Sequence, residues 1–449
     1  MSTEGSTTAG WLIQPGDARY DGARGAWNLI LDQRPAAVAL PATASDVVAA
    51  VSYAASRGLR IAPQSTGHGA TMLGDLAGTL LLKTARLRGI SIDPVARTAR
   101  VEAGVIWQDV VDAAAGHGLA TLAGSSPDVG VVGYTLGGGL SFLGRKHGFA
   151  ANSVLAIELV TADGRLVRAD ADHEEDLFWA LRGGGGSFGV VTAIEFRLFP
   201  LTHAYAGALW YPADRGGEVL PAWTKLTSDD VPEELTTLVR YLNLPPIPDI
   251  PEPLRGKSFV IVEAYHVGDP AVADELLDPL RGLGPVDDTI ATVPVPAILH
   301  LHMDPDHPVP GVGDGLTLDD LPDAAVEAIV TTVGPGPHPP LMSTEIRHLG
   351  GELGRARPGN GALASLDARY VLHAAHMTPA PDLVLPAMEQ IATIKSALSP
   401  WAARQSYMNF TDTWMYDAPM WPHETFERLR RVKLFTDPGN LFRANHPIP

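Results

Sequence analysis

The sequence that decides the fold is LFWALRGGGGSFGVVT, at residues 177–192. Two known loop patterns match inside it, G-x-G-x-x-G at residues 184–189 and G-x-S-x-G at residues 185–189. Both patterns require a strand before the loop and a helix after it. Here the order is reversed, because residues 174–181 are predicted to form a helix and residues 190–199 a strand. The segment therefore argues against both a Rossmann-type phosphate loop and a serine nucleophile.

Two further glycine-rich segments precede this one, at residues 64–69 and 124–148, and each adjoins a predicted strand. Glycine lets the backbone approach a ligand closely, and successive backbone N–H groups form a concave site for phosphate. A single such loop is weak evidence, because glycine is also common in tight turns. Three of them within the first 200 residues indicate a large anionic cofactor.

One histidine lies inside the first of these loops, where His68 is flanked by Gly67 and Gly69. The simplest interpretation is an ordinary surface histidine. Alternatively, a neutral imidazole is a nucleophile toward an electrophilic cofactor, and the flanking glycines would give a bulky ring system access to it.

The composition is that of a globular protein whose partners are small molecules. Of the 449 residues, 45% are hydrophobic and 19% are charged, and the formal net charge is −18. No cluster of Lys and Arg is present to neutralise phosphates, which argues against a nucleic-acid partner. No run approaches the ~18 apolar residues of a membrane span, so no membrane partner is expected. The oligomeric state is left open.

The chain contains no cysteine, which excludes disulfides, thiolate metal sites and cysteine nucleophiles. Its first residues, MSTEGSTTAGW, have neither the basic nor the apolar stretch of a secretory signal. We therefore expect a cytoplasmic protein.

The predicted elements change in character near residue 200. Before it, strands and helices alternate; after it, strand candidates recur with covering helices, which is typical of an antiparallel sheet. We predict an α+β fold of two domains. Residues 1–200, completed by 401–449, form the cofactor domain, and residues 201–400 form a substrate domain. The strands and helices expected most clearly lie at residues 37–40, 45–58, 59–63, 90–93, 98–102, 107–115, 154–161, 259–266, 343–348, 369–376 and 424–434.

Taken together, the motifs resemble the berberine-bridge-enzyme-like branch of the vanillyl-alcohol-oxidase flavoproteins, which share a PCMH-type FAD-binding domain. The resemblance covers about residues 30–200 and the last fifty residues. It is carried by the segments at 64–68, 124–130, 133–139, 145–148, 177–192, 407–410 and 437–442.

This resemblance implies FAD, joined through its 8α-methyl carbon to His68. It also implies pyrophosphate on the backbone of the first loop and isoalloxazine against residues 130–139 and 186–191. The cofactor-binding residues implied in this way are Gln64, Ser65, Thr66, Gly67, His68, Gly69, Ser126, Gly130, Gly133, Tyr134, Thr135, Gly138, Gly139, Gly189, Val190, Val191 and Asn409.

One position departs from many relatives. They carry a second covalent link from a cysteine two residues after the glycine that matches Gly124, and here that residue is Ser126. A hydroxyl is a poor substitute for a thiolate nucleophile. The flavin is therefore expected to be singly tethered, and a bulky carbohydrate substrate becomes less expected.

The implied reaction is hydride transfer from a C–H bond of a small or medium alcohol or amine to flavin N5, with dioxygen reoxidising the flavin to give hydrogen peroxide. A hydroxyl substrate also requires a general base. Tyr407 is the first candidate, because the resemblance places it near the flavin. Glu345, which shares a strand face with Arg347, and Tyr370 are the further catalytic candidates. Each strand residue could equally be an ordinary polar side chain.

Other strand candidates share a face in the same way, Tyr370 with His376 and Glu263 with Tyr265. Two other kinds of function stay open. One is a flavin-dependent oxidative cyclase or oxygenase of secondary metabolism.

The other is a hydrolase or metal-dependent enzyme. A metal would have to use the residues near His302, but prolines interrupt that segment and favour a solvated loop, so no metal site is predicted. The residues concerned are His300, His302, Asp304, Asp306 and His307.

Overall fold

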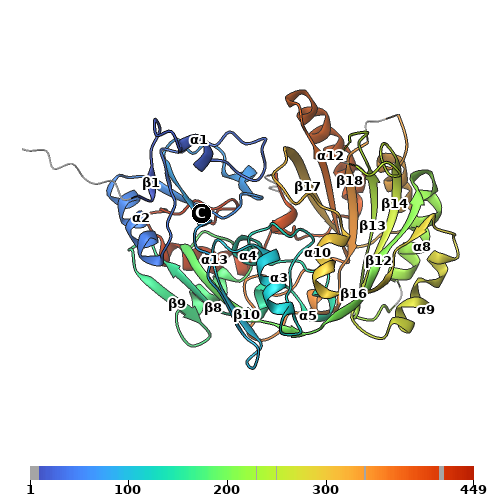
Figure 1. Cartoon of the computed structure of the whole chain (residues 1–449), viewed down its shortest axis with the longest axis horizontal. Helices are drawn as coiled ribbons and strands as arrows, with labels where there is room; N and C mark the ends of the chain where they lie inside the picture. Colours follow the sequence, from blue (N-terminus) through green and yellow to red (C-terminus); the bar gives the residue numbers. More distant parts are fainter. Residues whose placement is uncertain (1–9, 229, 249, 338–339, 414–418) are drawn as a thin grey trace, which may run out of the picture.

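The computed structural model describes residues 10–449 except 229, 249, 338–339 and 414–418. It has a two-domain, mixed α+β fold. Figure 1 shows an N-terminal part in blue and green beside a large sheet coloured from green to orange. The red helix α13 (His423–Thr436) lies with the N-terminal part.

The N-terminal part contains a mixed sheet and an antiparallel one. In the mixed sheet β4 pairs in parallel with both of its neighbours. Its order is β1 (Leu12–Ile13), β2 (Ala37–Ala39), β4 (Thr79–Lys83) and β3 (Arg60–Gln64). The antiparallel order is β5 (Ile90–Asp93), β6 (Thr98–Glu102), β10 (Val190–Arg197), β8 (Val154–Val160) and β9 (Leu166–Asp170).

Helix α2 (Ala44–Ser56) illustrates how local sequence sets an element. Thr43 caps it: its hydroxyl accepts from the Asp46 backbone N–H at 3.1 Å, and the Asp46 carboxylate accepts from the Thr43 N–H at 3.0 Å. This reciprocal capping box satisfies donors that a helix start leaves open. Val47 and Val51 lie on the buried stripe of the helix, as the apolar spacing predicts.

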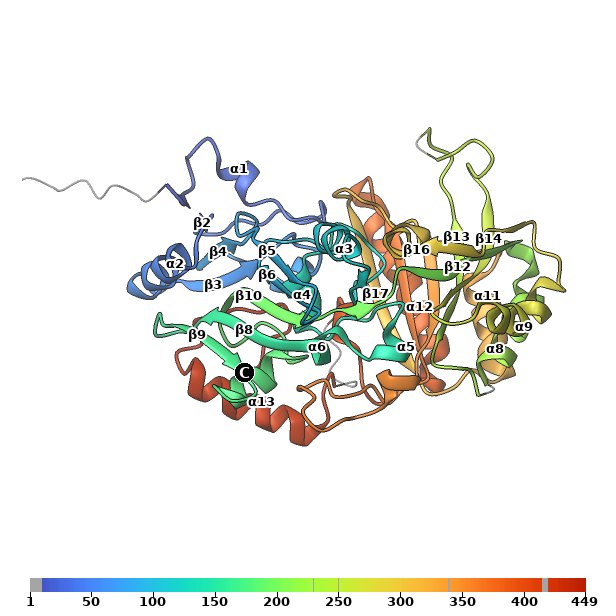
Figure 2. The same ribbon diagram turned by 60° about the horizontal axis from the view of Figure 1, so that its bottom comes forward.

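The second sheet is antiparallel throughout. Its path is β15 (Asp287–Asp288), β12 (His203–Pro212), β14 (Ser258–His266), β13 (Leu235–Asn243), β18 (Ser343–His348), β19 (Tyr370–Met377) and β17 (Gly311–Leu318), with β16 (Ala291–Pro294) beside β12. Figure 2 shows helices against the face turned away from the N-terminal part. These are α8 (Gly216–Ser228), α9 (Pro270–Arg281), α11 (Asp323–Val333) and α12 (Val384–Leu398). The prediction of an antiparallel sheet with covering helices is thus confirmed.

The opposite face of this sheet packs on the N-terminal part. The rings of Phe142 and Tyr265 stack there with centroids 3.9 Å apart. Tyr407 and Val371 share a second apolar cluster with Phe149. The polar side chains on this face are therefore placed next to the glycine-rich segments.

The C-terminal segment also returns to the N-terminal part. The Ile61 N–H donates to the Leu441 carbonyl at 2.8 Å. The ammonium of Lys433 is buried, 2.6 Å from the Asp437 carboxylate and 2.8 Å from the carbonyl of Ser187. The last residues thus complete the packing around the glycine run.

The order around that run is as predicted: α7 (Glu175–Leu181) precedes the loop and β10 follows it. Ser187 is buried, and its hydroxyl accepts from the Ile448 N–H at 3.0 Å. Ser187 is therefore a packing residue, which argues against a serine nucleophile in this loop. In the described part of the chain, no helix is both long and apolar enough to cross a membrane.

Candidate functional site

The glycine-rich segments and residues 407–410 meet in one region. A methyl group on Gly130 would lie 2.6 Å from the hydroxyl of Ser65, and one on Gly137 would overlap the Asn409 side chain. The N–H groups of Gly183 and Gly185 both donate to the Leu136 carbonyl, at 3.1 and 3.0 Å. Segments far apart in sequence are therefore in direct contact, at distances that only glycine allows.

His68 is held on three sides in this region. Its ring stacks on Trp27, with centroids 4.1 Å apart and planes 21° apart. Nδ1 lies 2.7 Å from the hydroxyl of Thr66, and Nε2 lies 3.4 Å from Oδ1 of Asp128. The indole N–H of Trp27 donates to the other oxygen of Asp128. The side chain of His68 is still 23% exposed, so a ligand can reach it.

Asp128 is the charged member of this group. Burial acts to raise the pKa of its carboxyl, but hydrogen bonding and charge from His68, together with the Trp27 N–H, outweigh burial and leave the pKa below 3.8. The carboxylate is therefore ionised at neutral pH. Ser126, at the position where relatives carry the second link, donates to the same carboxylate at 3.3 Å.

The region fits FAD on two observations. Among the described residues, the side-chain nitrogen of Gln64 and the hydroxyl of Ser65 are buried without a hydrogen-bond partner. Buried polar groups left unpaired cost free energy unless a ligand satisfies them. Gly67, Gly138 and Gly139 have positive φ angles of 97°, 116° and 78°, which open the backbone toward a ligand.

Tyr407 and Asn409 lie beside the glycines of residues 137–139. The Asn409 amide donates to the Tyr134 carbonyl at 2.9 Å and to the Tyr407 hydroxyl at 3.3 Å. Burial raises the pKa of Tyr407 above its ordinary value of 10. Tyr407 is therefore a neutral hydrogen-bonding phenol at working pH.

A buried ionic cluster lies on the sheet face that meets this region. Arg240 on β13 is directly opposite Glu345 on β18, and Glu263 comes from β14. Arg240 pairs with Glu263 at 2.8 Å, and Arg347 with Glu345 at 2.8 Å. Tyr265 donates to Glu263 at 2.6 Å. All of these side chains are at least nine-tenths buried.

His302, which follows α10 (Ile298–Leu301), joins the two halves of the cluster. Nδ1 is 2.8 Å from Glu263, and Nε2 is 3.1 Å from Glu345 and 3.6 Å from Asp304. Burial opposes ionisation of Glu345, but the charges of Arg347 and His302 outweigh it and hold its pKa well below 4.5.

The cluster also contacts the second glycine-rich segment. Ser125 donates to Asp304 at 2.7 Å, and Arg347 lies 3.5 Å from the Ser125 hydroxyl. The Arg347 guanidinium lies 5.0 Å from the ring centre of Phe142 and 5.1 Å from that of Phe410. Glu345 and Arg347 therefore face the glycine-rich segments, near Tyr407.

Tyr370 does not join this group, and its prediction as a catalytic residue is wrong on geometry. It lies on the helix-covered face of the sheet, where its hydroxyl is 3.0 Å from the Thr227 hydroxyl and its ring packs on Trp223. Strand alternation places Tyr370 and Arg347 on opposite faces. His376 has the same parity as Tyr370, and its Nδ1 accepts from the Met342 N–H at 3.0 Å.

The expectation of a solvated loop around residues 300–307 is only half right. His300, Asp306 and His307 are exposed, but His302 is 3% exposed and carries the ionic cluster. Prolines interrupt the segment, as the sequence shows. The His302 ring is nevertheless buried. Within the described residues no group of three or more His, Asp or Glu is arranged to hold a metal ion.

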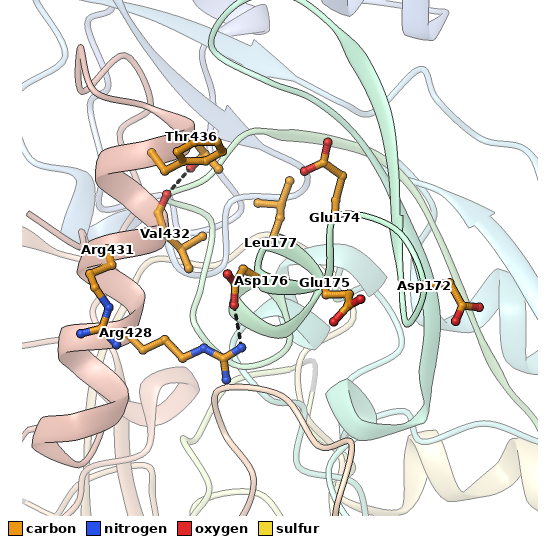
Figure 3. A pocket seen from close by; sticks show the side chains of 10 residues that line it. Asp172, Glu174, Glu175, Asp176, Leu177, Arg428, Arg431, Val432 and Thr436 are labelled. Atoms are coloured by element: carbon orange, nitrogen blue, oxygen red, sulfur yellow. Dashed lines mark hydrogen bonds and ion pairs between the residues drawn. The ribbon is translucent and has the colours of Figure 1, made fainter.

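A separate surface pocket of about 670 Å³ lies between α7 and α13 (Figure 3). Arg428 crosses it and pairs with Asp176 at 2.7 Å. None of the candidate site residues lines this pocket. Its lining residues are Asp172, Glu174, Glu175, Asp176, Leu177, Arg428, Arg431, Val432, Phe435 and Thr436.

Comparison with known families agrees with this geometry. Residues 35–170 match an FAD binding domain, and residues 406–449 match the berberine and berberine-like family. These segments contain the His68 loop, the Asp128 loop and the Tyr407–Asn409 segment. The match confirms the predicted resemblance and FAD as the cofactor.

Individual relatives give the same result. The chain is 34% identical to (R)-6-hydroxynicotine oxidase of Paenarthrobacter nicotinovorans over 63% of its own length and 60% of the relative's. It is 31% identical to the FAD-linked oxidoreductase YvdP of Bacillus subtilis, over 69% of this chain and 68% of that protein.

Among solved structures, 6-hydroxy-D-nicotine oxidase of Arthrobacter nicotinovorans superimposes with a TM-score of 0.80 at 25% identity, covering 97% of both chains. The sequence, the fold and the glycine-rich site agree, and the chain belongs to the berberine-bridge-enzyme-like family of FAD-linked oxidoreductases.

Proposed function

We propose that this protein is an FAD-dependent oxidase whose flavin is bound covalently to His68 and to no other residue. The observation that carries the proposal is the setting of His68. Its ring is fixed by Trp27, Thr66 and Asp128, yet remains accessible on a glycine-flanked loop. An ordinary surface histidine has no need of such constraint.

A single covalent link follows from the residues around Ser126. The chain has no cysteine, and the Ser126 hydroxyl is engaged with Asp128. An unactivated hydroxyl is also a weak nucleophile.

The FAD-binding part would comprise residues 1–200 and 401–449, with residues 201–400 covering it as the substrate part. The bonds between β3 and Leu441 support this division. Gln64, Ser65 and the backbone of the glycine-rich loops would hold the cofactor.

Bound FAD would supply a hydride acceptor that dioxygen reoxidises, with release of hydrogen peroxide. The substrate would be a small or medium organic molecule with an alcohol or amine group on the oxidised carbon. Tyr407 would orient that group as a neutral hydrogen-bonding partner. Phe410 and the Arg347 guanidinium lie nearby and would contribute an apolar wall and a polar end to the substrate site.

The first experiment is fluorescence of the denatured protein band, comparing wild type with His68→Ala. The matched control is His173→Ala, which changes a 75% exposed histidine elsewhere in the N-terminal part. We expect flavin fluorescence in wild type and the control and none in His68→Ala. A non-fluorescent wild-type band would contradict the covalent link.

Peroxide release with panels of alcohols and amines then tests the reaction. One peroxide per oxidised product supports an oxidase. Incorporation of labelled dioxygen into the product, without peroxide, would favour the oxygenase alternative. A product with a new ring and one peroxide would indicate an oxidative cyclase.

A further inference from the structure

Trp27, Asp128 and His68 form a connected group at the loop to which the flavin is proposed to attach. The Trp27 backbone N–H donates to the Thr66 carbonyl at 2.9 Å, which ties this tryptophan to the His68 loop. Its ring covers one face of the imidazole, and its indole N–H binds Asp128. Asp128 in turn faces Nε2 of His68 at 3.4 Å.

We propose that Asp128, oriented by Trp27, is a positioning residue for the attachment of the flavin to His68. It holds the imidazole as the tautomer with the proton on Nε2, so that the lone pair of Nδ1 forms the bond to the 8α carbon. This inference rests on the covalent link proposed above.

The electrostatics select this tautomer. A lone pair on Nε2 would face an ionised carboxylate and be repelled, whereas an N–H on Nε2 is attracted to it. The other nitrogen imposes no opposing choice, because the Thr66 hydroxyl rotates and can donate to Nδ1 as readily as accept from it. Nε2 is buried without a hydrogen-bond partner, and the stacked Trp27 ring keeps it beside the Asp128 carboxylate at 3.4 Å. Nδ1 gives up its contact with the Thr66 hydroxyl when it bonds to the 8α carbon. In serine proteases a carboxylate likewise fixes the tautomer of a histidine by binding one ring nitrogen, while the other nitrogen takes part in the reaction.

The attachment step is balanced without a new reagent. A bond forms between Nδ1 and the 8α carbon, and one C–H bond of the 8α-methyl group breaks. The flavin is thereby reduced by two electrons, and it takes up two protons in place of those lost from the methyl group and the imidazole. Dioxygen, already the oxidant of the proposed oxidase, accepts the two electrons and two protons as hydrogen peroxide. The carboxylate of Asp128 stabilises the positive charge on the imidazole while Nε2 still carries its proton.

The test measures total flavin and covalently bound flavin separately in the full-length protein. Asp128→Asn keeps the size of the side chain but removes its charge, and its amide can donate to Nε2 and so favour the wrong tautomer. We expect Asp128→Asn to bind total FAD as wild type does while attaching it roughly 10- to 100-fold more slowly during incubation with added FAD. The control is Asp109→Asn, which removes a carboxylate paired with Arg88 on the surface of the same part.

Two further variants separate positioning from folding. Asp128→Glu restores the carboxylate and should recover most of the attachment rate. Trp27→Phe keeps an aromatic ring over His68 but loses the indole N–H, and should slow attachment by a smaller factor. If Asp128→Asn binds no FAD at all, these two variants decide the question. The proposal is overturned if Asp128→Asn attaches FAD at the wild-type rate. If Asp128→Asn does not bind FAD, a wild-type attachment rate in Trp27→Phe overturns it.

The attachment atom in the wild-type protein tests the assigned tautomer directly. In protein labelled with ¹⁵N-histidine, the flavin-bearing peptide should show the 8α-methylene coupled to Nδ1. Coupling to Nε2 would contradict the assigned tautomer while leaving the covalent link intact. If the wild-type protein carries no covalent flavin, the covalent link in the proposed function is itself contradicted.

Discussion

Nδ1 of His302 lies 2.8 Å from Oε2 of Glu263, in the buried layer between the second sheet and the glycine-rich segments. Burial and Arg240 both act to lower the pKa of this imidazole. The carboxylates of Glu263, Asp304 and Glu345 outweigh them and raise the pKa to about 9. His302 is therefore a buried cation at neutral pH, and the carboxylates around it depend on its charge.

This relationship predicts a pH dependence of stability. The pKa of His302 in the folded protein is about 9, above the unfolded value of about 6.5. Its contribution, on the order of 3 kcal/mol, is fully present below pH 6.5 and is lost as the pH rises through 9. We expect the thermal midpoint of wild type to fall between pH 6.5 and 9.5 more steeply than that of His302→Gln. Equal slopes in the two proteins would contradict the prediction, and His173→Gln should keep the wild-type slope.

Glu345→Gln separates the structural role of this carboxylate from its predicted role as a base. With a pKa held well below 4.5 by Arg347 and His302, Glu345 accepts a proton poorly at neutral pH. We expect the variant to lose about 3–5 kcal/mol of stability, because the buried Arg347 loses its partner and the buried His302 loses one of its three carboxylates. Chemical unfolding followed by tryptophan fluorescence measures this loss. Unchanged stability with turnover reduced by about 10³-fold would instead support a catalytic base.

The two tyrosines provide a paired test of the sheet faces. Tyr407→Phe removes a hydroxyl bound to Asn409 beside the glycine-rich turn. We expect it to lower kcat roughly 10²-fold with flavin content unchanged, as is typical for loss of a positioned hydrogen-bonding or acid–base group. Tyr370→Phe should change kcat less than about twofold, because the Tyr370 hydroxyl contacts Thr227 on the helix-covered face of the second sheet. Steady-state peroxide release measures kcat of both variants. An equal loss of kcat in the two would contradict an active site on the face of the sheet that carries Arg347.

The elements with strong local signals could be predicted from the sequence. The hairpin of β5 and β6 and the helix α3 (Trp107–Ala115) have the predicted bounds, and β18 does as well. Each is defined by short-range alternation or helical spacing, which a single segment contains. Strand β4 was not predicted: it is buried along its whole length, so its side chains do not alternate in polarity.

The sequence singles out His68 because glycine and histidine share one motif there, but it does not reveal contacts between residues that are distant in sequence. Trp27 and Asp128 are 101 residues apart, and His302 and Glu263 are 39 apart. The contact of Lys83 with Gly25 could not be predicted for the same reason. The buried Lys83 ammonium donates to the Gly25 carbonyl at 2.7 Å. Burial lowers the pKa of this ammonium to about 8. Such pairs depend on strand register and loop packing, which a local pattern does not encode.

Gly67→Ala tests whether the backbone of the His68 loop sets flavin incorporation. Gly67 has a φ of +97°, and an added methyl would lie 2.7 Å from the Gln64 amide nitrogen and 2.9 Å from Ala26. A left-handed conformation and a crowded side chain each cost about 1–3 kcal/mol. We therefore expect covalent flavin to fall several-fold at an unchanged length of incubation with FAD, together with a lower thermal midpoint.

The matched control is Gly78→Ala, in the turn before β4, where no atom lies within 4 Å of an added methyl and φ is not in the left-handed region. It should retain wild-type flavin content and stability, because it adds neither strain nor overlap. Normal flavin content in both variants would mean that the loop tolerates a different backbone. His68 would then owe its orientation to its contacts with Trp27, Thr66 and Asp128, and the glycine beside it would serve only the turn.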